Sequence, residues 1–380
     1  MKKQISIENG KLHPIVKWAG GKEKELKYIV PNLPAKIRNY YEPFVGGGAV
    51  YTVLKAERYF INDRSSELIA LYQNISGKNR NFFFDATDEI IHNWNLLAII
   101  IENNSDLWIN MYKKYDRNMI DEMELRKILL EFISTSSKQL KKMFSWNSDN
   151  FIKEVKTHLI RKIKRMTELE KIKHPLSNKD ILDNIETALK SAFYIHFRHI
   201  YNNTEKYEIE SVYKSALFLF IRNYAYSGMF RYNSKGNFNV PYGGLTYNKG
   251  GLSKKTDYLR SKELKNLLDN TIIHNLDFED FLKMYNPEKN DFIFLDPPYD
   301  SEFSTYAQNE FTKSDQVRLA DYLIKKCKAK WMMVIKNTNF ISDLYDNKGL
   351  NIRFFNKTYR VSFMNRNNKK VEHLLITNYE

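Results

Sequence analysis

The sequence predicts an α/β fold that is interrupted by a mostly helical insertion. Residues up to about Leu71, and again from Asp291 onward, mix short apolar runs with Gly and Pro turns, which is typical of alternating strands and helices. From about Phe82 to Leu219, Gly and Pro are scarce and apolar residues recur at helical spacing. With 380 residues, of which 43% are hydrophobic, the chain can form two lobes with buried cores.

The individual elements follow in order along the chain. Apolar runs predict a strand that ends before a glycine turn at 46–48 and a second strand that ends at Asp63. The spacing of Ile90, Ile91, Trp94, Leu97 and Ala98 predicts a helix at the start of the insertion. Residues 223–251 are too rich in Gly, Asn and Tyr for a helix and predict a binding loop. The last part predicts a strand at 291–295, a helix at 316–326, a buried strand at 331–335 and a closing strand-like segment at 372–377.

The composition limits the kinds of partner and location that the protein can have. An excess of 60 Lys and Arg over 45 Asp and Glu gives a net charge of +15, which favours a polyanion such as nucleic acid. The single cysteine, Cys327, excludes an internal disulfide and a cysteine zinc cluster. No apolar run is long enough to span a bilayer and no export signal is visible, so we expect a cytoplasmic protein without membrane contact.

Residues 41–50, Y-E-P-F-V-G-G-G-A-V, form a glycine turn directly after a predicted strand. Glycines allow backbone to approach a ligand closely, and a helix that follows would present unpaired N–H groups. The alternative is a tight strand-to-helix turn without function. Asp63, at the end of the next strand, favours a ligand because a carboxylate there can accept both hydroxyls of a ribose. The pair indicates a cofactor that contains adenosine.

The second motif is Asp296-Pro297-Pro298-Tyr299, directly behind a predicted strand. Two prolines fix the backbone and remove two N–H donors, so nearby carbonyls remain available to a ligand. A carboxylate, a carbonyl and an aromatic ring could together bind the exocyclic amino group of a planar base. A structural Pro-Pro turn is the alternative.

Two further features are less specific. The segment K-W-A-G-G-K places Trp18 and Lys22 where they could contact a ligand, or where they could form an exposed basic turn around a buried Trp. The eight histidines show no metal-ligand spacing, and we expect His196 and His199 to lie on a solvated helix face, with no metal site in the protein.

The segment from Arg222 to Gly244 interleaves basic and aromatic residues. Arg222, Arg231 and Lys235 could contact phosphates, and the tyrosines among them could stack on bases. An aromatic-rich core hairpin is the alternative, but it would not require so many Asn and Gly. The pattern favours contact with nucleic acid. A second basic stripe is expected near the C-terminus, at Arg353, Lys357, Arg360, Arg366, Lys369 and Lys370.

Together these segments resemble the Dam-like DNA adenine N6-methyltransferases, which use S-adenosyl-L-methionine. The similarity rests on the order of K-W-A-G-G-K, E-P-F-V-G-G-G, the N-D pair, R-Y-N-x-K-G-x-F-N-V-P-Y-G, L-D-F-E-D, D-P-P-Y and E-H-L-L-I-T-N-Y. It covers the first ~75 residues and the last ~160. Relative to the smallest members, residues from about 76 to 215 are an enlargement. The resemblance implies a Rossmann-like methyltransferase sheet formed by residues 1–75 and 270–380, with residues 76–269 as a helical insertion and target-recognition domain.

The resemblance also assigns roles to residues. It implies that the D-P-P-Y residues are catalytic and that a second set binds S-adenosyl-L-methionine, namely Trp18, Lys22, Phe44, Gly46, Asp63, Asp277, Phe278 and Asp296. A third set would contact double-stranded DNA: Tyr226, Ser227, Met229 and Arg231. Ser227 departs from the Asn that is common in members that read GATC.

The expected activity is methyl transfer to N6 of an adenine that is rotated out of a short duplex site, with GATC as the first candidate. The adenine amino group is a poor nucleophile until its hydrogens are held, which Asp296 and the Pro297 carbonyl could do without a metal. Alternatives are an N4-cytosine methyltransferase, which Asp296 argues against, and a DNA-binding subunit without catalysis. The protein would belong to a bacterium or phage, near the nucleoid, with a possible restriction endonuclease encoded separately.

Overall fold

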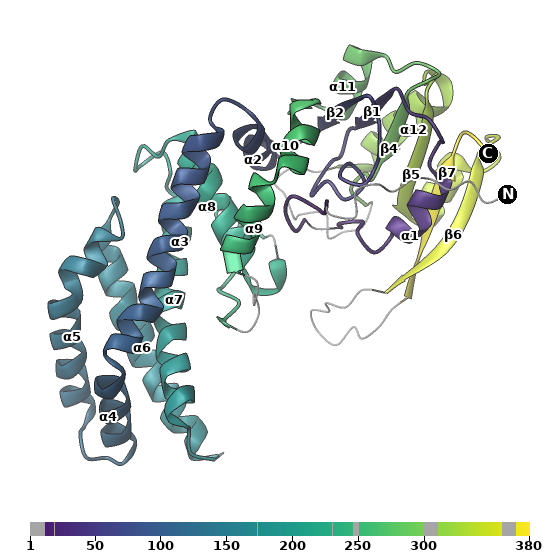
Figure 1. Ribbon diagram of the computed structural model, residues 1–380. Helices are drawn as coiled ribbons and strands as arrows, with labels where there is room; N and C mark the ends of the chain where they lie inside the picture. The colour runs from purple at the N-terminus through teal and green to yellow at the C-terminus, as the bar shows by residue number, and fades with distance from the viewer. Residues whose placement is uncertain are drawn as a thin grey trace. The chain divides into compact units, whose positions relative to one another are not determined.

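The computed structural model describes residues 12–18, 20–172, 174–229, 231–245, 251–299, 311–358 and 370–380. These residues pack as two compact units. The sheet unit consists of the described residues up to Arg80 together with Ser227–Gly236 and Asp257–Glu380. The helical unit consists of Asn81–Tyr226 and Asn237–Thr256. Figure 1 shows the elements of both units.

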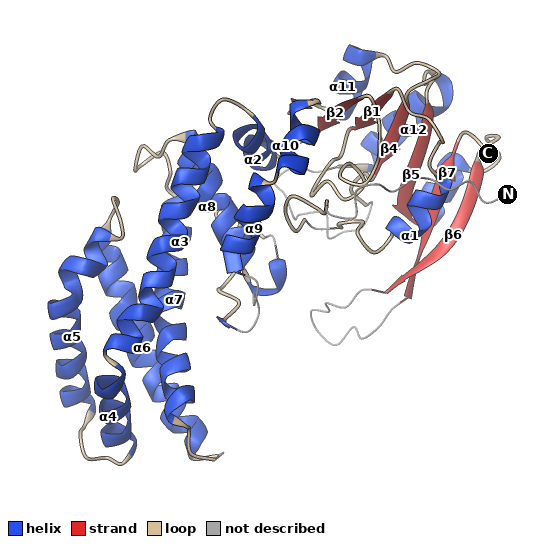
Figure 2. Cartoon of the chain, viewed as in Figure 1, coloured by secondary structure: helices blue, strands red, loops and turns tan. Residues whose placement is uncertain are grey.

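A seven-stranded sheet organises the sheet unit (Figure 2). Its strand order is β3-β2-β1-β4-β5-β7-β6, and β7 runs antiparallel to both of its neighbours. The strands are β1 (Asn39–Glu42), β2 (Arg58–Asn62), β3 (Thr271–His274), β4 (Phe292–Leu295), β5 (Lys330–Lys336), β6 (Asn351–Thr358) and β7 (Lys370–Thr377). The chain order reverses between β1 and β4, and in such sheets ligands bind outside the carboxyl ends of the strands at this switch point.

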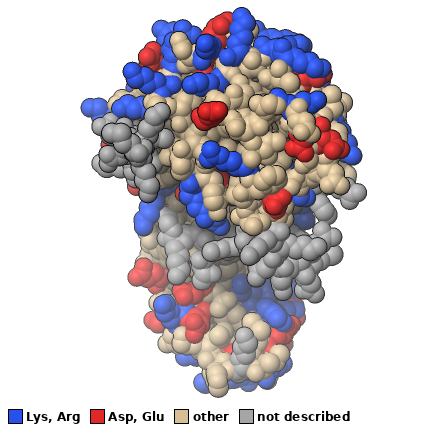
Figure 3. Space-filling view, turned by 90° about the vertical axis from the view of Figure 1, so that its right-hand side faces the viewer, with Lys and Arg blue, Asp and Glu red and all other residues tan. Residues whose placement is uncertain are grey.

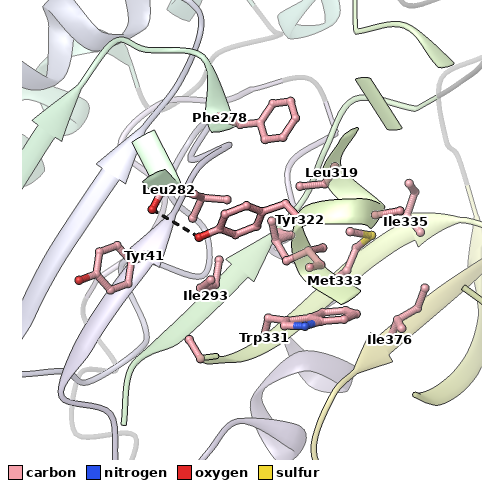
Figure 4. Packing of buried hydrophobic residues seen from close by; sticks show 14 of the residues in the cluster. Tyr41, Phe278, Leu282, Ile293, Leu319, Tyr322, Trp331, Met333, Ile335 and Ile376 are labelled. Atoms are coloured by element: carbon pink, nitrogen blue, oxygen red, sulfur yellow. Dashed lines mark hydrogen bonds between the residues drawn. The ribbon is translucent and has the colours of Figure 1, made fainter. Parts of the chain in front are cut away.

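One face of the sheet packs on helices α11, α12 and α13 (Figure 4). Alternate residues along the strands, such as Tyr41, Ile293 and Trp331, point into this layer because side chains of a strand alternate between its faces. Tyr322 of α12 donates its hydroxyl to the Leu282 carbonyl of α11 over 3.4 Å, which ties the two helices together.

Side-chain caps determine where several helices of the sheet unit begin. Asp277 caps α11 and the Thr312 side chain caps α12. These caps fix the helix starts close to the carboxyl ends of the strands. The helices are α1 (Leu26–Ile29), the 3-10 turn η1 (Val30–Asn32), α2 (Ser66–Ser76), α10 (Lys262–Asp269), α11 (Phe278–Tyr285), α12 (Lys313–Lys325) and α13 (Asn339–Tyr345).

The helical unit is built on long amphipathic helices around an aromatic core. Trp94 of α3 contacts Phe193 of α7 and Phe220 of α8, with ring centroids 5.5 and 5.3 Å apart. Trp108 packs on Phe132 at 4.5 Å in a second cluster. The elements are α3 (Arg80–Asn103), α4 (Ser105–Asp116), α5 (Glu122–Lys142), α6 (Ser148–Glu170), α7 (Asn178–Tyr201) and α8 (Ser211–Tyr224). The short elements η2 (Tyr226–Gly228) and α9 (Gly251–Arg260) each begin in this unit and end in the sheet unit.

The structure confirms the predicted α/β fold class and the helical stretch, which α3 to α8 occupy. The predicted strands at 291–295 and 331–335 are β4 and β5, and the helix predicted at 316–326 is α12. One expectation was wrong: successive turns, not an α-helix, follow β1 over residues 43–53. Within the described part of the chain, no helix is long and apolar enough to cross a membrane.

Candidate active site

The glycine turn after β1 is held between three neighbouring segments. Gly46 has a φ of +50°, and a Cβ there would lie 2.8 Å from Cδ1 of Trp18, so only glycine fits beneath the indole ring. The Asp63 carboxylate accepts from Gly46 N at 3.0 Å, and the Tyr72 hydroxyl donates to the Gly46 carbonyl at 3.0 Å. The structure therefore brings together Trp18, Gly46 and Asp63, which the resemblance assigns to one cofactor site.

Asp63 connects the ends of β1 and β2. Its second carboxylate oxygen accepts from Ser65 N at 2.9 Å, and its own carbonyl accepts from the Asn275 amide at 2.7 Å. Burial raises the pKa of Asp63 to about 6, against the lowering effect of its backbone donors. A partly buried carboxylate with this pKa gains from a ligand that brings hydroxyl donors or positive charge.

Asn62, the other half of the N-D pair, has a role that the sequence did not reveal. Its side chain is 1% exposed. It donates to the carbonyls of Pro43 and Leu276 and accepts from Leu276 N at 2.8 Å. One buried amide thus links the loops after β1, β2 and β3.

Asp296 lies at the carboxyl end of β4 and pairs with Lys22. The Lys22 ammonium, whose side chain is 2% exposed, donates to Asp296 Oδ1, to the Gly20 carbonyl at 2.9 Å and to the Tyr299 hydroxyl at 3.3 Å. An ammonium has three N–H donors, so these acceptors satisfy all of them. The ion pair therefore joins the K-W-A-G-G-K segment to the D-P-P-Y turn.

Two buried residues outside the predicted set support the D-P-P-Y turn. Gln316 of α12 donates to the Pro298 carbonyl at 2.8 Å. His373 of β7 lies 3.3 Å from the Tyr299 hydroxyl through its Nε2. Both side chains are 0% exposed. Gln316 carries no sequence signal apart from its place in α12, whereas His373 lies in the matched E-H-L-L-I-T segment.

A third carboxyl lies beneath the turn. Glu42 ends β1, is 2% exposed and accepts from the Tyr40 hydroxyl at 2.7 Å. Burial, together with the charges of Asp296 and Asp63, raises the pKa of Glu42 well above its usual range. Glu42 therefore keeps its proton near neutral pH and adds a hydrogen-bonding group, not a negative charge, to these strand ends.

Asp277 and Phe278 lie at the start of α11, after β3. Arg318 pairs with the Asp277 carboxylate at 3.1 Å, and its guanidinium lies 4.8 Å from the centre of the Phe278 ring. Phe44 packs against Phe278 and Phe311 at 5.6 and 5.4 Å. The structure therefore joins Phe44 to Phe278 in one aromatic wall. Arg318 was not predicted.

The four residues predicted to contact DNA occupy the turn after α8. Tyr226 is 47% exposed, Arg231 is exposed, and Ser227 and Met229 are half-buried. Ser227 has a left-handed φ of 57°, which bends the chain at this point. Tyr226 belongs to the helical unit and the other three to the sheet unit.

Part of the basic and aromatic segment forms core instead of a binding surface. Arg222 is 1% exposed and Tyr224 is 5% exposed, so the prediction that Arg222 contacts phosphate and that Tyr224 stacks on bases was wrong. Tyr224 packs on Trp94 with ring centroids 4.4 Å apart. Within this stretch, the predicted core alternative describes these two residues correctly.

The prediction for His196 was also wrong. Its side chain is 0% exposed and lies against Phe144, with ring centroids 4.4 Å apart. Burial lowers the pKa of His196 to about 4, so the ring is neutral. In the described ranges, no group of three or more His, Cys, Asp or Glu could hold a metal ion.

On the face that Figure 3 draws, basic side chains do not form one continuous patch. Figure 3 shows Lys and Arg scattered over one face of the molecule, with Asp and Glu among them. Of the basic stripe predicted near the C-terminus, Arg353 is exposed on β6, whereas Arg360, Arg366 and Lys369 lie outside the described residues. The side chains of Lys357 and Lys370 are not described either.

The turn Asp296-Pro297-Pro298-Tyr299 at the end of β4, with Lys22 paired to Asp296, is called the corner below. The sheet order, the glycine turn and this corner meet at one switch point and define a Rossmann-like methyltransferase. The chain belongs to the D12 class N6 adenine-specific DNA methyltransferase family, which it matches over residues 18–189 and 179–362. It is therefore an adenine-specific DNA methyltransferase.

Individual relatives agree with this assignment. The Type II methyltransferase M.CviBI of Paramecium bursaria Chlorella virus NC1A is 26% identical over 97% of this chain and 100% of its own length. A DNA adenine methylase of Vibrio cholerae is 24% identical over 96% of this chain and 95% of its own. The Retron Ec67 DNA adenine methylase of Escherichia coli is 30% identical over 43% of this chain and 54% of its own.

Proposed function

We propose that this enzyme transfers a methyl group from S-adenosyl-L-methionine to N6 of an adenine that is rotated out of a short duplex site. The observation that carries the proposal is the corner at the end of β4. Asp296 there is held by Lys22, beside Tyr299 and the proline carbonyls. The corner lies at the switch point, where ligands of such sheets bind.

The residues at this switch point fit S-adenosyl-L-methionine. Asp63 offers a carboxylate for the ribose hydroxyls, and the wall formed by Phe44 and Phe278 offers a surface for the adenine ring. The charge of Asp296 adds to the burial that raises the pKa of Asp63, so a cationic sulfonium and amino group would be favoured beside these two carboxylates. When bound, the cofactor supplies a methyl group that is already activated by its positive sulfur.

The protein must then prepare the acceptor nitrogen. The lone pair of the adenine amino group is delocalised into the ring, and hydrogen bonds from both of its hydrogens make it available. Asp296 and the carbonyl of Pro297 are the two acceptors, while Tyr299 stacks on the base. Pro297 is buried and is followed by Pro298, so the backbone around its carbonyl is rigid before the base arrives. Orientation and electrostatics supply the rate enhancement.

We assign recognition of the DNA sequence to the turn after α8. Exposed Arg231 can donate to guanine O6 and N7 in the major groove, and exposed Tyr226 can enter the base stack, with Ser227 and Met229 beside them. The preferred DNA site would therefore contain an adenine and a guanine, and GATC is the first candidate. Because some relatives are named Type II methyltransferases, we further propose a restriction-modification role with a separately encoded nuclease.

Analysis of the methylated product tests this proposal. Duplex DNA would be incubated with the enzyme and methyl-labelled cofactor, digested to nucleosides and separated by mass spectrometry. We expect the label in N6-methyladenine alone, and only from duplexes that contain a preferred site. Label in N4-methylcytosine, or equal labelling of all adenines, would contradict the proposal. A DNA-binding subunit without catalysis would transfer no label.

A further inference from the structure

His373 contacts the active-site corner from a strand that carries none of the residues predicted for catalysis. It is fully buried on β7, between Lys336 of β5 and Phe355 of β6. Its Nε2 lies 3.3 Å from the Tyr299 hydroxyl, and its Nδ1 lies 3.1 Å from the Val371 carbonyl. The two rings meet edge to face with centroids 5.6 Å apart.

The partners of His373 determine which of its nitrogens carries the proton. A carbonyl oxygen can only accept a hydrogen bond, so Nδ1 must carry the proton that it donates to Val371. In a neutral ring, Nε2 is then an acceptor and receives the Tyr299 hydroxyl proton. This order leaves the Tyr299 oxygen free to accept from Lys22 Nζ at 3.3 Å. The chain of donors therefore runs in one direction from Lys22 to Val371.

We propose that His373 is a positioning residue for methyl transfer, because its Nε2 accepts from the Tyr299 hydroxyl, orients it and thereby fixes the Lys22 ammonium against Asp296. The inference rests on the proposed function, since it assigns the orientation of groups that hold the target base. Without the Nε2 acceptor, the Tyr299 hydroxyl would lose the hydrogen bond to His373 that sets its orientation, and its oxygen would be held less firmly against the Lys22 ammonium. Lys22 would then hold Asp296 less firmly when the base arrives.

A double-mutant cycle tests the contact itself. His373→Phe keeps a ring but removes the acceptor, whereas His373→Gln retains an acceptor oxygen at a similar reach. We expect His373→Phe to lower kcat about fivefold to tenfold with KM for DNA little changed, and His373→Gln to restore most of that loss. In a Tyr299→Phe background, His373→Phe should cause little further loss. Equal losses for both His373 variants, or full additivity with Tyr299→Phe, would overturn the inference.

A second measurement needs no activity. Long-range proton–nitrogen NMR of the ¹⁵N-histidine protein, with the signal assigned by its loss in His373→Gln, reports which ring nitrogen carries the proton. We expect a neutral ring protonated at Nδ1 near neutral pH. A proton on Nε2, or a charged ring, would contradict the proposed order of donors. Because this readout is made on the free enzyme, it separates an error in the inference from an error in the proposed function.

Discussion

The motif residues of the two units differ in where the fold places them: those of the sheet unit meet at a strand end, whereas two of the helical unit are buried in its core. In the sheet unit, Lys22 and Asp296 are far apart in sequence but form an ion pair at a strand end. In the helical unit, Arg222 and Tyr224 come from a segment whose composition predicted DNA contact, yet both are buried in the core. The position of a residue at the carboxyl end of a parallel strand is thus a stronger functional signal than composition, because the topology itself gathers such residues.

The largest effect that follows from this comparison is expected at Asp296. Asp296→Ala removes the acceptor for the amino group but no phosphate contact, so methyl transfer should fall by about 10²-fold or more while DNA affinity is retained. A tritiated-methyl assay and a DNA-binding titration measure the two quantities. Asp280→Ala, an exposed carboxylate of α11, is the matched control and should keep normal turnover. Normal turnover in Asp296→Ala would show that the corner does not take part in catalysis.

The second-largest effect is expected from substitution of Asp63. Asp63→Ala is expected to weaken cofactor affinity by about 1–3 kcal/mol, because the ribose hydroxyls would lose a charged acceptor. Calorimetric titration with S-adenosylhomocysteine measures the change. An unchanged dissociation constant would place the ribose elsewhere in the sheet unit.

The pH dependence of cofactor binding sharpens the assignment of Asp63. Burial raises its pKa to about 6, so the folded chain takes up this proton more readily than the unfolded chain, and the carboxyl lowers stability as the pH rises toward 6. Binding needs the charged form, so affinity for S-adenosylhomocysteine should fall about tenfold per pH unit below about pH 6. Asp63→Asn should show weak binding with a flatter profile. Equal profiles for both proteins would contradict the role of this carboxylate.

Two arginines of one segment allow the comparison to be tested directly. Arg231→Ala should cost about 1–3 kcal/mol for the preferred site and relax preference at one base pair, because Arg231 is exposed. Buried Arg222→Met should lower the free energy of unfolding and leave the ranking of sites unchanged. Methylation of a randomised duplex library gives the ranking, with exposed Lys235→Ala as a control for loss of charge. An unchanged ranking in Arg231→Ala would make this residue a phosphate contact.

The smallest effect is expected at Gln316. Gln316→Leu removes the donor to the Pro298 carbonyl, so kcat should fall about fivefold. The buried Oε1 of Gln316 has no partner among the described residues, so its removal offsets part of the lost hydrogen bond. Stability by urea titration should therefore change by less than about 1 kcal/mol. A large loss of stability without a change in kcat would show that Gln316 supports only the core.

The sequence predicted the strands and the turns that follow them, but it did not predict contacts that depend on how separate elements pack. Apolar runs predicted β4 and β5 because a buried parallel strand requires a continuous apolar stretch. The glycine turn and the D-P-P-Y turn were found because each follows such a strand. Gln316 and His373 were not identified as supports of the corner, because their contacts with Pro298 and Tyr299 depend on how α12 and β7 pack. The burial of Arg222 and His196 likewise depends on neighbours that periodicity does not reveal.

In the proposed mechanism, the corner around Asp296 methylates adenine at a DNA site that the turn after α8 recognises. Methylation-sensitive long-read sequencing tests it most directly, on unmethylated genomic DNA exposed to the enzyme and S-adenosyl-L-methionine. We expect N6-methyladenine at one short motif that contains a guanine, and a relaxed motif for Arg231→Ala in the same experiment. Modified cytosine, or modified adenine without a shared motif, would contradict it.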